Sequence, residues 1–181
     1  MAEMKLKGPA TVEDLIQTPK DGLKYELVDG EIVVSPAGMR HSAVALKIAA
    51  AILNFVRPRS LGEVYTADAG IILPNGNVRS PDVTFVRTSK LPGGQSPESY
   101  GALVPDLVVE VLSPNDDLRT VEAKIVEYFE NGVPLVWLVD PATESLTAYT
   151  SITETERFLS HNTLTAKSIL PGFSCLVADF F

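Results

Sequence analysis

The sequence predicts an α/β fold of the α+β kind, in which a mixed central sheet is flanked by helices and has antiparallel strands at its edges. Residues 105–139 have the pattern strand, helix, strand, which implies a right-handed parallel crossover within one sheet. Residues 24–35 and the weakly alternating tail (145–149 and 156–159) have instead the pattern of antiparallel strands. The two patterns together predict a mixed sheet.

The most apolar strand is Asp106-Leu107-Val108-Val109-Glu110-Val111-Leu112, between Pro105 and Ser113-Pro114. A nearly continuous apolar run is typical of a strand that is buried on both faces. A carboxylate inside such a strand is costly unless it is paired or binds a cation. Glu110 is therefore either a structural residue, in a salt bridge or bonded to the backbone, or a metal ligand or catalytic group.

Length and composition are those of one soluble domain covering residues 1–181. The net charge of −8 argues against a protein that coats nucleic acid, but an acidic enzyme can act on phosphates when a divalent cation supplies local positive charge. Cys175 is the only cysteine, which favours a reducing compartment. Residues 1–8 have no apolar signal core, and the apolar stretch 42–53 is too short to span a bilayer. We therefore expect a cytoplasmic protein.

The first elements are a short helix and a hairpin. Thr11 has the position of an N-cap for a helix over residues 11–16. Residues 24–28 and 31–35 flank Asp29-Gly30, a strong signal for a two-residue hairpin turn. Glu26 lies in the first of these strands, and its simplest interpretation is a side chain that faces solvent.

A long helix is predicted over residues 40–56. We expect it to be mostly buried, because its apolar residues form two adjoining rows: Ala43, Leu46, Ala50 and Leu53, and Ile48, Ile52 and Val56. His41 lies in the first turn, where the helix dipole disfavours the imidazolium. It is either a surface histidine or a residue exposed to a ligand.

Strands over 63–66, 70–73 and 78–86 follow, and Asp82 comes directly after Pro81 in the last of them. The Pro- and Gly-rich residues 88–103 form a predicted flexible loop. Residues 113–117 lead into a predicted helix over 118–131 that ends before Gly132.

Four side chains of this pattern could form a catalytic group: Glu26, Asp82, Glu110 and Lys124. Asp106 and Glu110 are four residues apart on one strand, about 13 Å, so they cannot share a metal ion. Asp82 is on another strand, and sheet pairing can bring its carboxylate beside Glu110. Two carboxylates with a backbone carbonyl and water form a Mg²⁺ site, and a nearby lysine can orient the water that attacks phosphorus.

The sequence also resembles a known family. The matching segments occur in the expected order: Tyr25-Glu26-Leu27-Val28-Asp29-Gly30-Glu31, Pro81-Asp82-Val83, Pro105 through Pro114, Glu122-Ala123-Lys124 with Tyr128, Gly132-Val133, Trp137-Leu138-Val139-Asp140-Pro141 and Leu170-Pro171-Gly172-Phe173. They are similar to the bacterial restriction endonucleases of the Uma type, in the PD-(D/E)XK nuclease superfamily. The resemblance implies a restriction-endonuclease-like fold.

The resemblance also implies roles for individual residues. Asp82 and Glu110 match the metal-binding acids, and Glu26 matches an acidic residue on the first strand. His41 matches a position that is often histidine. The superfamily lysine two residues after the glutamate is replaced here by Leu112, and Lys124 on the following helix is implied as its substitute.

The function that we expect is hydrolysis of phosphodiester bonds, in DNA, by an endonuclease that depends on Mg²⁺ or Mn²⁺. A homodimer is expected, because the superfamily often pairs active sites and because the apolar Phe180 and Phe181 could seal a partner surface; their alternative role is to seal the core of their own chain. The alternative is a catalytically idle protein of the same fold that binds nucleic acid or a protein, which the net charge and Leu112 favour. A hydrolase of another phosphorylated substrate has no sequence feature of its own.

Overall fold

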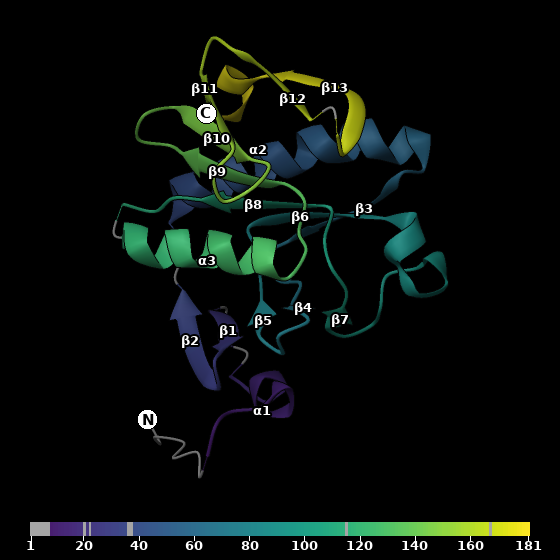
Figure 1. The fold of residues 1–181 in the computed structure, drawn as a ribbon, viewed down its shortest axis with the longest axis vertical. Coiled ribbons are helices and arrows are strands. Elements are labelled where there is room, and N and C mark those ends of the chain that lie inside the picture. Colours follow the sequence, from purple (N-terminus) through teal and green to yellow (C-terminus); the bar gives the residue numbers. More distant parts are fainter. Residues whose placement is uncertain (1–7, 20, 22, 36–37, 115, 167) are drawn as a thin grey trace.

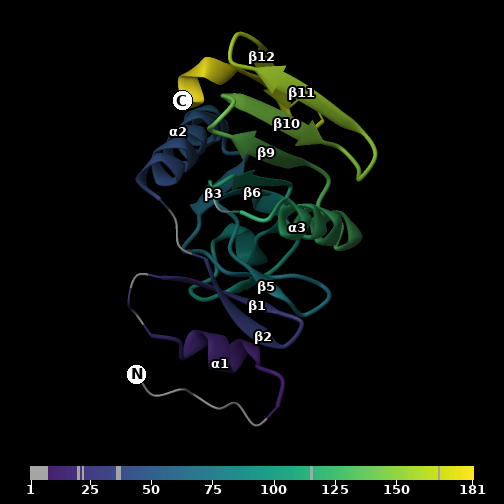
Figure 2. The same ribbon diagram turned by 90° about the vertical axis from the view of Figure 1, so that its left-hand side faces the viewer.

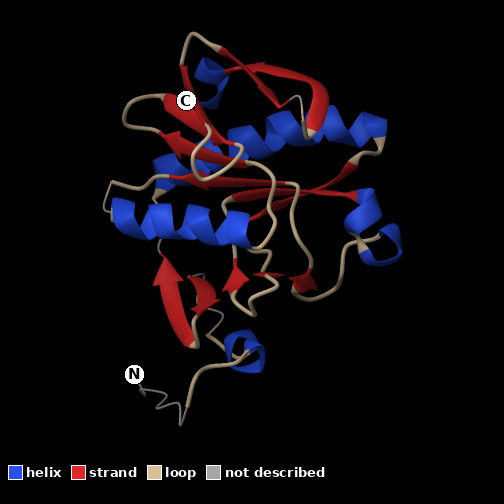
Figure 3. Ribbon diagram, viewed as in Figure 1, coloured by secondary structure: helices blue, strands red, loops and turns tan. Residues whose placement is uncertain are grey.

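The computed structural model describes residues 8–19, 21, 23–35, 38–114, 116–166 and 168–181. Residues 1–7, where the sequence shows no signal core, and Asn115 in the predicted lead-in to the second long helix, lie outside these ranges. The described chain forms a large mixed sheet with a helix on each side, and a smaller sheet lies below it in Figure 1. Figure 3 shows the same view coloured by helix and strand.

In the described part of the chain, six strands form the central sheet in the order β11-β10-β9-β8-β6-β3. Their bounds are β3 Gly62–Thr66, β6 Val83–Arg87, β8 Leu107–Val111, β9 Val136–Asp140, β10 Ser145–Tyr149 and β11 Thr155–Leu159. Strands β8 and β9 are parallel and the other neighbours are antiparallel. The predicted mixed sheet with a parallel crossover is confirmed, and so are antiparallel edge strands from the tail.

The N-terminal hairpin lies in the second sheet, so the prediction that it extends the central sheet is wrong. That sheet has the order β2-β1-β5-β4-β7. Its strands are β1 Lys24–Val28, β2 Glu31–Ser35, β4 Ile71–Ile72, β5 Val78–Arg79 and β7 Gly101–Ala102. The predicted strand 78–86 is split between the sheets, because Pro81 has no N–H to continue a ladder.

Short sequence motifs predicted the first helix and the hairpin correctly. Helix α1 (Val12–Ile16) begins with a capping box between Thr11 and Asp14. Asp29 and Gly30 both have positive φ, 50° and 79°, as a two-residue hairpin turn requires. The predicted loop 88–103 is more structured than expected, since it contains the 3₁₀ turns η2 (Thr88–Lys90) and η3 (Pro92–Gly94) as well as β7.

The two long helices cover opposite faces of the central sheet (Figure 2). Helix α2 (Met39–Val56) packs through Ile48 and Ile52 on the face that carries Val109 and Trp137. Helix α3 (Leu118–Glu130) packs through Ile125 and Tyr128 on the other face, with Val108 and Val136. Since side chains alternate along a strand, Glu110 shares the α3 face with Val108.

The chain ends with a hairpin and a short turn that close the α2 side. The elements are β12 Thr163–Ala166, β13 Leu170–Leu176 and η4 Val177–Phe180. Phe180 is 1% exposed and belongs to the core that α2 covers. Of the two roles suggested for the terminal aromatic residues, Phe180 therefore fills the core of its own chain.

The prediction that α2 is mostly buried is wrong for one of its two rows. Ile48, Ile52 and Val56 are fully buried, but Leu46 is 66% and Leu53 38% exposed. Among the described residues, one helical stretch, Met39–Arg59, is long and apolar enough by composition to cross a membrane. Its inner row packs on the sheet, so here it is a core helix with an apolar outer face.

Candidate functional site

The site lies where β6 begins and β8 ends. The antiparallel register pairs Val83 with Val109, and one further step sets Asp82 opposite Glu110. Both carboxylates are buried, with Asp82 4% and Glu110 8% exposed. The strand pairing thus brings together the two acids that the sequence singled out as metal ligands.

Asp82 is held by three donors. The Lys24 ammonium lies 3.2 Å from Oδ1, while His41 Nε2 lies 3.0 Å and the Val111 amide 2.8 Å from Oδ2. Burial raises the pKa of Asp82, but His41 and Lys24 lower it more strongly, and the net pKa is about 2. The hydrogen bond to Asp82 in turn raises the pKa of His41. His41 therefore faces the site from the first turn of α2.

Glu110 is held by helix α3. The Tyr128 hydroxyl donates to Oε1 at 2.5 Å, and Lys124 Nζ lies 3.6 Å from the same oxygen. Burial raises the pKa of Glu110, and the nearby Asp82 charge adds to this, although Lys124 opposes it. Within the described residues, every hydrogen bond and ion pair of Glu110 uses Oε1. Oε2 is left for a further ligand.

Lys124 lies at the site between the carboxylates of Glu26 and Glu110. Its Nζ is 3.2 Å from Oε2 of Glu26 and 3.6 Å from Oε1 of Glu110. Burial lowers the pKa of Lys124, but Glu110 and Glu26 raise it above the ordinary value. The ammonium therefore stays charged and is aimed between the sheet and α3.

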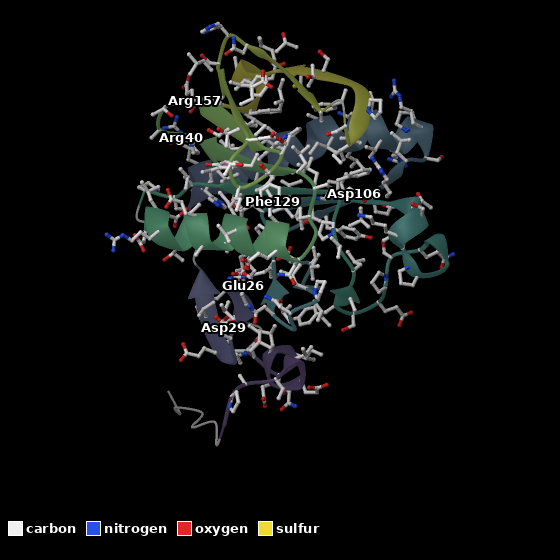
Figure 4. All side chains as sticks on the ribbon, in the orientation of Figure 1. Glu26, Asp29, Arg40, Asp106, Phe129 and Arg157 are labelled. Carbon is white, nitrogen blue, oxygen red and sulfur yellow. The ribbon has the colours of Figure 1, made fainter. Side chains whose placement is uncertain are left out.

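Glu26 does not face solvent, as its simplest interpretation had suggested. It is 2% exposed and lies between the hairpin and α3 (Figure 4). The Ser80 amide donates to Oε1 at 2.9 Å, and Arg79 Nη1 donates to Oε2 at 3.2 Å. Burial raises the pKa of Glu26, but the charges of Lys124 and Lys24 lower it more strongly, so that the net pKa is below its usual value. Glu26 does not line the cavity that Asp82 and Glu110 share, so it is better suited to hold Lys124 than to bind a metal ion there.

A buried polar network behind Glu26 was not predicted from the sequence. Arg79 donates through Nε and Nη2 to Glu127, and Nε is 2.7 Å from Oε2. Asn77 and Asn75 also donate to Glu127, at 2.5 and 2.9 Å. Spacing offered a partial signal, because Glu127 lies one helical turn after Lys124.

Lys24 is a further residue that the sequence analysis missed. It lies 3.2 Å from Asp82 and 4.0 Å from Glu26. Its position two residues before Glu26 on the same strand was a usable signal, since alternate strand residues share a face.

Asp106, the second aspartate that follows a proline, and Leu112, at the position of the superfamily lysine, are not part of this group of charged side chains. Asp106 accepts from the Arg87 amide at 2.9 Å and pairs with Lys90 at 3.0 Å, well away from Glu26 in Figure 4. Leu112 lines the same cavity as Asp82 and Glu110, but its side chain has no donor.

These side chains surround a cavity of about 120 Å³ that is lined by Lys24, His41, Asp82, Glu110, Ser113 and Lys124, among others. Larger hollows adjoin it. One of about 930 Å³ includes Met39, Arg40 and Leu118, and one of about 680 Å³ includes Arg79, Arg119 and Glu127. The small cavity therefore lies at the junction of more open surface grooves.

The balance of charges at the site is compatible with a bound cation. Four carboxylates lie against three lysine and arginine side chains, which is an excess of one negative charge when His41 is neutral: Glu26, Asp82, Glu110 and Glu127 against Lys24, Arg79 and Lys124. Within the described ranges, no three His, Cys, Asp or Glu side chains are arranged to hold a metal ion. A cation at Asp82 and Glu110 would need main-chain oxygen and water as well, which is the usual shell of Mg²⁺. The residues fit such an ion on these terms.

Among solved structures, the fold is similar to a crystal structure described as "a putative nuclease belonging to DUF820" from Anabaena variabilis ATCC 29413. The TM-score is 0.83 with 21% sequence identity, over 96% of this chain and 98% of that one. A search of curated proteins gives no match. The family model Uma2, described as "Putative restriction endonuclease", matches residues 12–178. Since this match spans nearly the whole chain, the protein belongs to the Uma2 family, which confirms the resemblance in its sequence.

Proposed function

We propose that the protein is an endonuclease that hydrolyses phosphodiester bonds in DNA and depends on Mg²⁺ or Mn²⁺. The observation that supports this most directly is the convergence of Asp82, Glu110 and Lys124 on one cavity, from three different elements. Two acids and a lysine are the side chains that metal-assisted attack on phosphorus needs. The membership in a family described as restriction endonucleases agrees with this chemistry.

In this proposal Asp82 and Glu110 would hold the cation. When bound, the cation supplies positive charge that stabilises the phosphate as negative charge develops on it. Lys24 and His41 occupy both oxygens of Asp82. Because a carboxylate oxygen has two lone pairs, Oδ1, whose partner among the described residues is Lys24, is the more open of the two oxygens.

Lys124 replaces the lysine that Leu112 does not supply. Its ammonium orients the attacking water, and Glu26 keeps it in place at 3.2 Å. Arg79 and the Ser80 amide hold Glu26 in turn. Tyr128 donates to the carboxylate of Glu110 and fixes it. Glu110 and Lys124 therefore both have restricted positions.

A DNA substrate is supported by the open grooves around the cavity and by the exposed Arg40 and Arg119 that line them. These two cations are suited to contact phosphates on either side of the scissile bond. With its single cysteine and this substrate, the protein is proposed to act in the cytoplasm.

The proposal is tested by incubating the protein with supercoiled plasmid and Mg²⁺ or Mn²⁺, with EDTA as the control. Mn²⁺ binding is measured separately by electron paramagnetic resonance. We expect nicking or linearisation that EDTA abolishes, and Mn²⁺ binding that Asp82→Asn removes. If the parent protein binds DNA or Mn²⁺ but cuts neither supercoiled nor single-stranded substrate, the proposal is wrong and the catalytically idle alternative replaces it.

A further inference from the structure

The outer face of α2 is apolar and exposed, although it belongs to the most apolar helix of the described chain. Met39 is 93%, Leu46 66% and Leu53 38% exposed, and Ala43 and Ala50 between them are exposed as well. We call these five residues the outer stripe. An exposed, contiguous row of this kind marks an interaction surface more often than isolated apolar residues do.

The spacing of the outer stripe is that of a helix–helix seam. Its residues follow one another at intervals of 4, 3, 4 and 3, the a/d repeat of two packed helices. The stripe extends about 21 Å along the helix and covers roughly 80° of its circumference. It is therefore a narrow ridge suited to one partner helix, rather than a broad face.

The sizes of the residues alternate in the same register. Ala43 and Ala50 take one heptad position, and Met39, Leu46 and Leu53 take the other. In a parallel pair, Ala would face Ala and Leu would face Leu, which leaves alternate gaps and bulges. In an antiparallel pair the two positions face each other, so each layer has one large and one small residue. The stripe is thus complementary to a second copy of itself, as a two-fold interface requires.

The charges beside the stripe argue against a membrane surface as its partner. Arg40 lies 3.9 Å from Glu144, and Lys47 donates to the main-chain oxygen of Phe181 at 2.6 Å. Lys47 is therefore engaged within the chain, and Arg40, which lines the groove beside the active site, pairs with Glu144 at the exposed surface. An interfacial membrane helix presents a broad apolar face opposite a basic one that lies in water, whereas the opposite side of α2 packs on the sheet.

We propose that two copies of the chain associate through the outer stripes of their α2 helices, antiparallel and around a two-fold axis. Leu46 of each copy packs against Ala50 of the other, and Ala43 packs against Leu53. This register sets Met39, which lines the groove beside the active site, opposite Arg57 of the other copy. The proposal does not depend on nuclease activity.

The test is the mass of the full chain in solution, measured by light scattering at micromolar concentrations. We expect a dimer for the parent and a monomer for Leu46→Glu, because a buried carboxylate would lie against the partner helix. Ile152→Glu is the matched control: Ile152 is 57% exposed, lies outside α2, and its change should leave the dimer intact. Circular dichroism checks the fold, and Ala50→Glu replaces Leu46→Glu if that variant is unfolded.

Orientation is tested with cysteine pairs in a Cys175→Ser background. Leu46→Cys mixed with Ala50→Cys should form a crosslinked dimer under oxidation, whereas Ala43→Cys alone should not. A monomeric parent, a dimer that survives both glutamate variants, or self-crosslinking of Ala43→Cys would each overturn the proposal. So would a monomer that sediments with phosphatidylglycerol vesicles through Leu46, since the stripe would then bind a membrane.

Discussion

Asp82 and Asp106 are two similar aspartates with different surroundings. Each follows a proline, precedes a strand of the same antiparallel pair and is buried, with 4% and 2% exposure. Each accepts a hydrogen bond from an amide near the far end of the other strand: Asp82 from Val111 at 2.8 Å, Asp106 from Arg87 at 2.9 Å. Each also has a lysine partner, Lys24 at 3.2 Å and Lys90 at 3.0 Å.

Asp82 and Asp106 lie at opposite ends of the β6–β8 strand pair, and these two ends differ in the groups that surround the aspartate. Asp82 adjoins a second buried carboxylate, Glu110, and a cavity of about 120 Å³. The ion pairs of Asp106 in the described chain are with two half-exposed cations, Arg87 and Lys90. The same local motif thus serves to join strands at one end and to form an acid-rich pocket at the other. What distinguishes a candidate site from a structural contact is the second acid, and not the Pro-Asp dipeptide.

The largest expected effect is on cleavage. Asp82→Asn and Glu110→Gln should each reduce plasmid cleavage to the level seen with EDTA, because one of the two carboxylates proposed to bind the metal ion is lost. Asp106→Asn is the matched control and should cut at close to the parental rate. Cleavage that survives Asp82→Asn, or that disappears equally in Asp106→Asn, would remove the distinction between the two ends.

The next effect concerns the lysines of the two ends. Lys124→Ala should lower the rate of cleavage by about 10²–10⁴-fold, the scale of a positioned acid–base group, while Mn²⁺ binding is retained. Single-turnover kinetics and electron paramagnetic resonance measure the two quantities. Lys90→Ala, which removes the partner of Asp106, should leave both almost unchanged. Parental turnover in Lys124→Ala would show that the ammonium has no part in catalysis.

The network behind the site should be sensitive to loss of its cation. Arg79→Met leaves Glu26 and Glu127 buried without their guanidinium, and we expect the free energy of unfolding to fall by about 3–5 kcal/mol. Urea denaturation measures it. The double variant Arg79→Met/Glu127→Gln should recover part of the loss, because one unpaired charge is removed. A single variant as stable as the parent would contradict the pairing.

The smallest expected effect separates the two aspartates by stability. Asp106→Ala should cost about 1–3 kcal/mol, since the buried Arg87 amide loses its acceptor. Asp82→Asn should cost less than Asp106→Ala, because an asparagine oxygen still accepts from the Val111 amide and the variant relieves repulsion from Glu110, which offsets part of the stability that the pKa of about 2 represents. The same denaturation experiment checks both. A larger loss for Asp82→Asn than for Asp106→Ala would reverse the interpretation of the two ends.

The sequence alone determined the features that depend on a few neighbouring residues. Asp29-Gly30 predicts the hairpin, Thr11 the helix cap and Gly132 the end of α3, because each supplies a backbone conformation or a hydrogen bond within one turn. The parallel crossover from β8 to β9 was also predictable, since two apolar strands joined by one helix permit few connections. Asp82, Glu110 and Lys124 could be selected because charged groups are rare in such strands and beside apolar helix faces.

Only the tertiary structure decided which surfaces are covered. The sequence pattern could not show that the outer stripe of α2 remains exposed, or that the hairpin joins a second sheet. It also could not show that Glu26 is enclosed by Arg79, Ser80 and Lys124. Hydrophobic periodicity records which faces are apolar, but burial depends on elements that are distant in sequence. For the same reason Asp82 and Asp106, alike in their local sequence, differ once the fold brings Glu110 to one and Lys90 to the other.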